Sequence, residues 1–406
     1  MPAPFSLFGI EIELMIVDRE TLDVRPLADQ LLLDEKGNIV NSVNHGDITW
    51  SNELVSHVLE LKTSEPTSSL DGWSERFHQS MQEADRQLSA FGAGLLGGGM
   101  HPWFDPERET HLWTHDDREI YDAFDHIFGC RGHGWSNLQS FHLNLPFDDD
   151  ESFRRLHSAI RLVLPLIPAL AASSPFIDGK ISGLLDTRLR TYQGNCARIP
   201  SITGGVIPEV YRSESEYREK VFDVIAHDLA PWNPDELLEP EWTNARGAIA
   251  RFDRHAIEIR VGDAQECPRR DLAIIEAIVF LLRNWYGENS VALGDQENVS
   301  TSALAALFEA SIRAGRHAMI TGAPLLKALG LNRPATITEA LETNFQTAPE
   351  SNWKREIDAI LTEGSLSERL LELPTPISHD CLQTQMRQMR ECLLTNRPLS
   401  TRLPAL

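Results

Sequence analysis

Acidic residues at alternate positions are the first feature of this sequence that could do chemistry. Glu11 and Glu13 alternate with apolar residues, and Glu60 lies within a second apolar run that follows Glu53. Alternate side chains of a β-strand point to the same face of a sheet, so Glu11 and Glu13 would lie side by side. Two carboxylates on one face repel each other, so a cation or an arginine must compensate their charge unless solvent covers the face. The pattern therefore indicates either a cation site or an acidic surface.

The segment from Ser140 to Asn144 would place three polar side chains on one face of a strand. Ser140, His142 and Asn144 alternate there with Phe141 and Leu143. An uncharged polar triplet is unusual on an outer face, where charged residues and threonine are commoner. The pattern is typical of a ligand-binding face or, equally, of a buried histidine whose hydrogen bonds are satisfied.

Arginines accompany another strand-like segment. Glu258 and Arg260 alternate, and Arg246, Arg251 and Arg254 precede them. A guanidinium group can donate to two oxygens of one phosphoryl group or carboxylate, so these arginines could hold a phosphate. A surface ladder of ion pairs is the alternative interpretation.

A run of alternating charges also follows Asp186. In an extended segment, Asp186, Arg188 and Arg190 would share one face. The two guanidinium groups could then hold the carboxylate of an amino-acid substrate, and Asp186 could hold its ammonium group. An exposed ion-pair ladder is again the alternative.

These polar pairs are more informative together than singly. Carboxylates with one imidazole suit Mg²⁺ or Mn²⁺, and arginines beside them suit phosphate. Both features are needed for phosphoryl transfer from a metal–nucleotide, in which positioning and charge neutralisation supply most of the catalysis. The sequence therefore predicts this chemistry.

Several strands from distant parts of the chain must position these side chains. Apolar and alternating runs predict strands at 8–17, 55–61, 140–145 and 256–261. Helices are expected at 70–88, 150–170, 268–286, 302–320, 338–345, 352–361 and 379–394. Strands and helices do not alternate at βαβ spacing, and the glycine-rich LLGGGMHPW lacks the lysine of a P-loop. We predict an α+β fold with a largely antiparallel sheet, a catalytic domain over 1–295, and a helical region over 296–406 packed on it.

Composition limits the classes of partner. The 406 residues carry a net charge of −23, which argues against a nucleic-acid partner. Five cysteines at irregular spacing, without a CxxC pair, argue against a zinc site or a disulfide framework. The N-terminus lacks the pattern of a signal peptide, and no apolar stretch reaches the roughly 18 residues of a membrane span. We expect a cytoplasmic protein without nucleic-acid or membrane partners.

In their order, these segments resemble motifs of the glutamate–cysteine ligase superfamily, which includes related carboxylate–amine ligases with a glutamine-synthetase-like sheet. FGIEIE resembles the opening G-x-E-x-E strand, LELKTSEPT the second acidic strand, and GGGMHPW the GGGTHPF segment, with methionine where threonine is common. HLN resembles the H-x-N strand, and EIRVGD resembles the E-x-R-x-x-D strand. SSPF, together with the arginines that follow it, resembles the SSPF…R segment. The resemblance covers about residues 5 to 290.

The resemblance implies a funnel-like antiparallel sheet, flanked by helices, that binds Mg²⁺ (or Mn²⁺) and ATP. The implied metal ligands are five carboxylates and one imidazole: Glu11, Glu13, Glu53, Glu60, His142 and Glu258. Arg260 and Glu258 would form the catalytic centre, with Arg260 in contact with the transferred phosphoryl group. The implied substrate- and phosphate-binding residues are Arg188, Arg190, Asn144, His101 and Arg246.

The implied activity is ATP-dependent amide formation. A carboxylate, by resemblance the γ-carboxylate of glutamate, becomes an acyl phosphate, and cysteine or another amine then displaces the phosphate. The partners would be these small molecules, and assembly into a homo-oligomer is left open. The alternatives are a phosphotransferase on the same sheet and a nucleotide-binding regulatory protein of the same fold without ligase activity.

Overall fold

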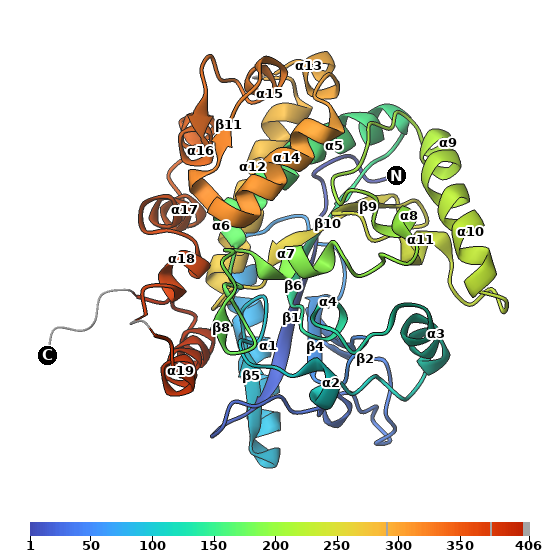
Figure 1. The fold of residues 1–406 in the computed structure, drawn as a ribbon, viewed down its shortest axis with the longest axis vertical. Coiled ribbons are helices and arrows are strands. Elements are labelled where there is room, and N and C mark those ends of the chain that lie inside the picture. The colour runs from blue at the N-terminus through green and yellow to red at the C-terminus, as the bar shows by residue number, and fades with distance from the viewer. Residues whose placement is uncertain (290, 374–375, 401–406) are drawn as a thin grey trace, which may run out of the picture.

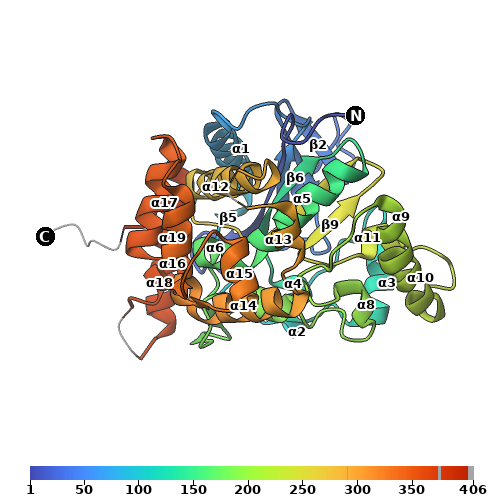
Figure 2. The same ribbon diagram turned by 90° about the horizontal axis from the view of Figure 1, so that it is seen from above.

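The computed structural model describes residues 1–289, 291–373 and 376–400, in which helices surround one antiparallel sheet (Figure 1, Figure 2). Its strands run in the order β2, β3, β4, β1, β6, β10 and β9, and β5 pairs with the second half of β1. The strands are β1 (Gly9–Asp18), β2 (Ser42–His45), β3 (Ile48–Asn52), β4 (Val58–Thr63), β5 (Ala93–Leu96), β6 (Ser140–Pro146), β9 (Ala248–Arg251) and β10 (Ala256–Asp263). Every pairing in this sheet is antiparallel, so the predicted fold class is confirmed.

β1 is the central strand that holds the sheet together. Its first half pairs with β4 on one side and β6 on the other. Ile10, Ile12 and Leu14 are at most 1% exposed and belong to the core formed with the apolar faces of the helices. The glutamates between them must therefore project from the opposite face of the sheet.

Helices lie around the sheet, and the last of them ends at Thr395. The longer ones are α1 (Trp73–Leu88), α3 (Arg118–Phe128), α5 (Asp150–Val163), α12 (Pro268–Tyr286), α14 (Thr301–Ala314), α16 (Ile337–Phe345), α17 (Asn352–Glu363) and α19 (His379–Thr395). The shorter ones are α2 (Pro106–Glu109), α4 (His133–Ser136), α6 (Ile167–Ala171), α7 (Thr187–Tyr192), α8 (Pro200–Thr203), α9 (Glu214–Tyr217), α10 (Asp223–Leu229), α11 (Pro240–Thr243), α13 (Leu293–Glu297), α15 (Ala323–Ala328) and α18 (Leu366–Leu370).

Prolines and glycines explain where the observed helices differ from the expected ones. The helix expected over 150–170 breaks after Val163, because Pro165 and Pro168 lack the N–H groups that would continue it. The helix expected over 302–320 ends at Ala314, before Gly315 with its φ of 52°. Beyond it, β11 (Met319–Ile320) pairs with β12 (Ala335–Thr336).

Three of the C-terminal helices share one hydrophobic core with the sheet. Buried apolar residues of α14, α16 and α17 belong to the same cluster as those of β1, α5 and α12. The predicted boundary at residues 295 and 296 therefore crosses a continuous core and stays a prediction; residues 401–406 of the expected C-terminal region lie outside the described residues. Within the described part of the chain, no helix combines the length and apolarity needed to cross a bilayer.

Candidate active site

The polar face of the sheet gathers acidic residues from neighbouring strands. In the register of β1, Glu11 lies opposite His142 of β6 on one side and Lys62 of β4 on the other, while Glu13 lies opposite Glu60. Side chains two apart on β1 share a face, so the strand order itself brings these residues together. The convergence expected from the alternating pattern is present.

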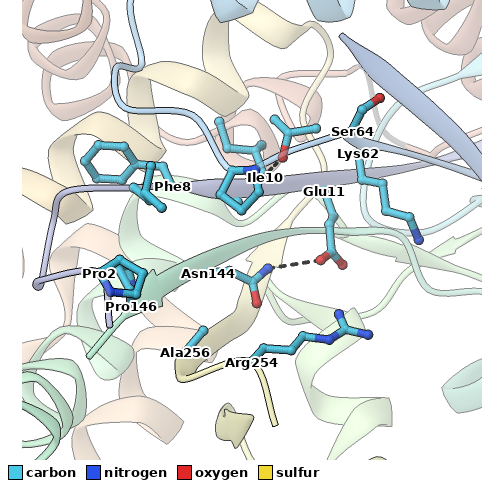
Figure 3. Close-up of a pocket in the computed structure, with 14 residues that line it drawn as sticks. Pro2, Phe8, Ile10, Glu11, Lys62, Ser64, Asn144, Pro146, Arg254 and Ala256 are labelled. Carbon is cyan, nitrogen blue, oxygen red and sulfur yellow. Dashed lines mark hydrogen bonds between the residues drawn. The ribbon is translucent and has the colours of Figure 1, made fainter. Parts of the chain in front are cut away.

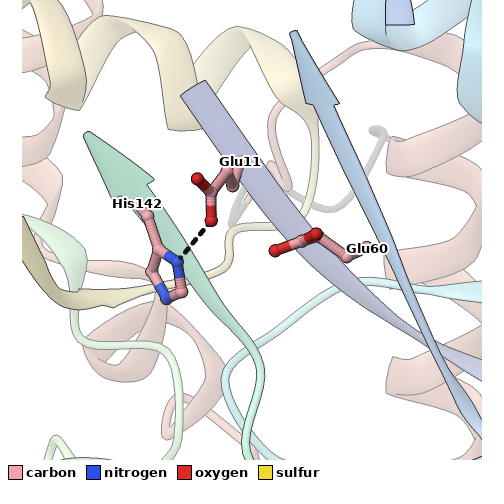
Figure 4. A group of neighbouring side chains, drawn as sticks. All are labelled: Glu11, Glu60 and His142. Carbon is pink, nitrogen blue, oxygen red and sulfur yellow. Dashed lines mark hydrogen bonds and ion pairs between the residues drawn. The ribbon is translucent and has the colours of Figure 1, made fainter. Parts of the chain in front are cut away.

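A compact group of possible cation ligands lies at the centre of this face. Ligand atoms of Glu11, Glu60 and His142 are all within 4.8 Å of one another, and Figure 4 shows them facing each other from three adjacent strands. Glu13 Oε1 and Glu258 Oε1 each lie 3.8 Å from a ring nitrogen of His142.

Hydrogen bonds fix the side chains of this group. His142 Nδ1 is 2.9 Å from Glu11 Oε2, and Asn144 Nδ2 donates to Glu11 Oε1 at 3.0 Å. On the other ring edge, His142 Nε2 is 3.0 Å from Ser140 Oγ, which donates to Glu13 Oε2 at 2.9 Å. The polar triplet on β6 therefore orients two carboxylates.

The group holds more negative charge than its surroundings favour. Burial, then the charge of Glu11, raises the pKa of Glu60 to about 7, although Lys62 Nζ is 2.7 Å away. Burial, then Glu60 and Glu13, raises the pKa of Glu53 well above its usual range. Burial opposes the charged form of His142, but its hydrogen bond with Glu11 and the nearby carboxylates raise its pKa to about 9.

This chemistry fits a hard divalent cation. Two carboxylates and one imidazole match the oxygen-rich sites that Mg²⁺ and Mn²⁺ prefer, and the group needs a positive charge that the proton of His142 supplies. A bound cation would replace that proton, because a ligating imidazole must be neutral. Glu11, Glu60 and His142 are therefore the residues best placed to hold a metal.

A first cavity, of about 390 Å³, opens beside Glu11. Figure 3 shows Pro2, Phe8 and Pro146 at one end, and Lys62 and Arg254 at the end near Glu11. An apolar cleft with cationic groups beside an acidic cluster can take a flat apolar ring at one end and an anion at the other.

A second cavity, of about 210 Å³, opens beside Glu13. Its charged lining has both signs and comprises Glu13, Glu53, His142, Arg188 and Arg260. Its aromatic lining comprises Tyr121 and Phe124 of α3, Trp135 of α4, and Tyr192 of α7. A cavity of this size and lining can hold a small zwitterion.

The two arginines of this cavity are held by buried carboxylates. Arg260 Nη2 is 2.9 Å from Glu258 Oε1, and Arg251 Nε donates to Glu258 Oε2 at 3.2 Å. Arg188 Nε donates to Oδ1 of Asp263, which is fully buried. Each guanidinium group is thus oriented before any ligand arrives.

The interpretation of residues 186–190 as one extended face is wrong. These residues begin α7, in which Asp186 is the N-cap and accepts a hydrogen bond from Leu189 N at 2.8 Å. Arg188 lines the second cavity, whereas Arg190 pairs with Glu309 outside it.

Two further predicted binding residues also lie outside both cavities. His101 is 1% exposed, and its Nε2 is 2.8 Å from the carbonyl oxygen of Leu22; burial lowers its pKa to about 4. Arg246 is buried and donates to the carbonyl oxygen of Ser201 at 3.0 Å. Both side chains serve the packing of loops around the sheet.

Sequence reasoning left several cavity residues without a role. Lys62 could have been found, because it follows Glu60 at the spacing that places both on one strand face. Tyr121, Phe124 and Trp135 come from short helices whose sequences carry no motif, and only tertiary packing brings them to the cavity.

The chain is similar to proteins of one known family. The model of the glutamate–cysteine ligase family 2 (GCS2) matches residues 7–373. An uncharacterized protein of Archaeoglobus fulgidus is 34% identical over 394 residues, which cover 96% of this chain and 99% of that protein. A Cupriavidus metallidurans protein named "Putative glutamate--cysteine ligase 2" is 31% identical over 195 residues, 45% of this chain and 46% of that protein.

Two solved structures share the fold. The glutamate–cysteine ligase of Francisella tularensis, in complex with AMP, has a TM-score of 0.56 at 12% identity and covers 97% of this chain and 95% of its own. The bifunctional glutathione synthetase of Pasteurella multocida has a TM-score of 0.54 at 15% identity; 95% of this chain aligns with 53% of that one, so this chain spans about half its length. The family match runs through nearly the whole chain, and this protein therefore belongs to the glutamate–cysteine ligase family 2 and is an enzyme of the ligase class.

Proposed function

We propose that the protein is an ATP-dependent carboxylate–amine ligase whose donor is a glutamate-like amino acid. The observation that carries this proposal is the position of the acidic group between two unlike cavities. One cavity suits a nucleotide and the other suits a small zwitterion. A phosphoryl group must pass between two such ligands in the first step of acyl-phosphate chemistry.

ATP is assigned to the cavity beside Glu11. Its apolar end would take the base, and Lys62 and Arg254 would lie along the phosphates. A divalent cation held by Glu11, Glu60 and His142 would neutralise charge on the phosphate oxygens.

The amino-acid donor is assigned to the cavity beside Glu13. Arg188, held by Asp263, can donate to the α-carboxylate, and the acidic lining can receive the α-ammonium group. Arg260 lies where it can donate to the phosphoryl group as its charge redistributes during transfer.

The reaction proceeds in two balanced steps. An oxygen of the donor carboxylate attacks the γ-phosphorus, the bond to the β-phosphate oxygen breaks, and ADP leaves. The acceptor amine then attacks the acyl carbon, phosphate leaves with the bonding electrons, and the nitrogen loses a proton. No enzyme nucleophile is needed, which agrees with the absence of cysteine from the linings of both cavities.

The test measures ADP release and amide formation with glutamate and a panel of amines that includes cysteine. The expected result is that ADP release requires both a carboxylate and an amine, and that mass spectrometry detects one amide per ADP. Arg260→Lys should lower kcat by about a hundredfold or more, as loss of a transition-state donor does. Arg190→Gln is the matched control, because that guanidinium group lies outside the cavity. ADP release that ignores both substrates, or that yields no amide with any amine, would refute ligation.

A further inference from the structure

Three buried basic side chains lie together outside both cavities. His157 and Arg161, of α5, are 1% and 0% exposed, and Arg246, just ahead of β9, is 5% exposed. His157 and Arg161 are one helical turn apart and so share a face of α5. Burial first, and then both guanidinium groups, lowers the pKa of His157 to about 3. Arg246 therefore lies beside His157 and not in the proposed ligase site.

The donors of this group are only partly satisfied. Arg161 Nε donates to the carbonyl oxygen of Pro208 at 2.8 Å and Nη2 donates to Thr301 Oγ1 at 3.1 Å, but Nη1 has no hydrogen-bond acceptor among the residues that the structure describes. Within the same part of the chain, Arg246 Nε has no hydrogen-bond acceptor and the two ring nitrogens of His157 have no hydrogen-bond partner. These four buried nitrogen atoms belong to three side chains, of which the most exposed, that of Arg246, is 7% exposed.

The positive charge of this group is balanced only in part: burial lowers the pKa of Arg161 to about 10, although the charges of Glu209 and Glu297 act in the opposite direction. Among the described residues, the hydrogen bonds of Arg161 go only to backbone carbonyls and a hydroxyl. The carboxylate beside Arg246 is Glu209, whose Oε2 is 3.6 Å from Arg246 Nε and accepts a hydrogen bond from the Tyr211 hydroxyl; its side chain is 49% exposed. A buried cation without a close partner is strongly disfavoured. Water could satisfy the four nitrogen atoms, but Arg161 would still lack a carboxylate in hydrogen-bond contact among the described residues.

We propose that a small monovalent anion of halide size binds between Arg161, Arg246 and His157. The enclosure favours a halide over phosphate, because a larger and doubly charged ion would lose far more hydration free energy on entering so buried a site. This site is separate from the proposed ligase activity and touches neither of its cavities.

Anion binding would also steady the strand that carries two active-site residues. Arg246 adjoins Gly247, whose carbonyl oxygen accepts a hydrogen bond from Arg260 N at 3.1 Å. Arg260 and Glu258 belong to β10, which pairs with β9 immediately after Gly247. An anion that fixes Arg246 therefore supports the edge of the sheet next to the acidic group.

Two experiments with bromide test the proposal. In crystals grown in sodium bromide, the anomalous difference map should show a peak within hydrogen-bonding distance of Arg161 Nη1 and Arg246 Nε. In solution, replacing sodium gluconate with sodium bromide at constant ionic strength should raise Tm in proportion to the logarithm of the bromide concentration once it exceeds Kd. Arg246→Gln should lose this rise. Arg155→Gln should keep it, because Arg155 lies on α5 with His157 and Arg161 but is paired with Glu151 and Glu288.

Three outcomes would overturn the proposal. The first is ordered water without an anomalous peak at the site. The second is an equal Tm in the two salts. The third is a bromide peak with the same Tm response in both variants, which would mean an adventitious ion only. The crystal experiment uses the unmodified protein, so it remains decisive if Arg246→Gln fails to fold.

Discussion

Replacing Asp263 by asparagine should destabilise the fold and weaken donor binding together. Asp263 is fully buried; its Oδ1 accepts from Arg188 Nε, and its Oδ2 accepts from Ser173 N at 2.9 Å and from Ser174 Oγ at 2.7 Å. An asparagine amide must point its NH₂ group at one of these donors. The change also removes the charge that balances Arg188, which is itself 2% exposed. Breaking a buried ion pair from one side costs about 3–5 kcal/mol.

A second buried carboxyl group should limit this cost. Asp186 is fully buried near Arg188, and burial, then the charge of Asp263, raises its pKa well above its usual range. Burial therefore favours the neutral form of the Asp186 carboxyl group, while Asp263 forms the direct ion pair with Arg188. Once Asp263 is neutral, Asp186 can ionise and partly balance Arg188. We expect a loss near the lower limit, about 3 kcal/mol of unfolding free energy.

Urea unfolding of the two single variants and the double variant at pH 7 measures this arrangement. Asp186→Asn alone should change the free energy of unfolding by less than about 1 kcal/mol, because asparagine caps a helix as well as aspartate does. The double variant should lose more than the sum of the two single losses, because neither carboxylate then balances Arg188. Two results would show that Asp186 does not replace Asp263 as the partner of Arg188. One is additive losses of unfolding free energy, and the other is a loss for Asp186→Asn as large as that for Asp263→Asn. In the ligase assay, Asp263→Asn should raise the KM for the donor more than the KM for ATP.

Three further predictions concern other buried charges. Glu258→Ala should raise the divalent-cation concentration needed for half-maximal turnover, whereas an unchanged requirement would remove this carboxylate from the acidic group. Burial lowers the pKa of His101 to about 4, so between pH 6.5 and 4 the unfolded chain takes up a proton that the folded chain does not. The free energy of unfolding should therefore fall on acidification, and His101 should contribute about 3 kcal/mol of that fall. The urea midpoint of His101→Gln should fall less over the same pH range than the midpoint of the unmodified protein. The guanidinium group of Arg369 lies 2.8 Å from the fully buried Glu266, so Arg369→Met removes the ion-pair partner of that carboxylate. The free energy of unfolding, measured with urea, should fall by about 3 kcal/mol, and a fall of less than about 1 kcal/mol would contradict this prediction.

Alternating and apolar runs in the sequence correctly predicted four strands of the sheet, which are β1, β4, β6 and β10. On β10, Ile257 and Ile259 are buried in the core, so Glu258 must face the other way. The same rule placed Glu11 beside Glu13 and His142 beside Ser140 and Asn144, and the pairing of β1 with β6 brings Glu11 opposite His142. It did not find β2, β3, β5 or β9, because strands of four or five residues carry too little pattern to distinguish them from loops. The cavity residues of α3 and α4 could not be predicted from the sequence, because only tertiary packing brings them to the cavity.

Charged residues at alternate positions are weaker evidence than apolar ones, and the start of α7 shows why. In a strand, Arg188 and Arg190 would point the same way, but two residues along a helix turn the direction by about 200°. Arg188 therefore reaches the buried Asp263, while Arg190 reaches Glu309 outside the cavity. Asp186 decides between the two conformations: its carboxyl group is fully buried and needs a donor, and the helix supplies Leu189 N at 2.8 Å. Asp186, three residues ahead of Leu189, was thus a helix-capping signal. It outweighs the alternation of the arginines, because a buried carboxyl group and a buried backbone N–H both need a hydrogen-bond partner.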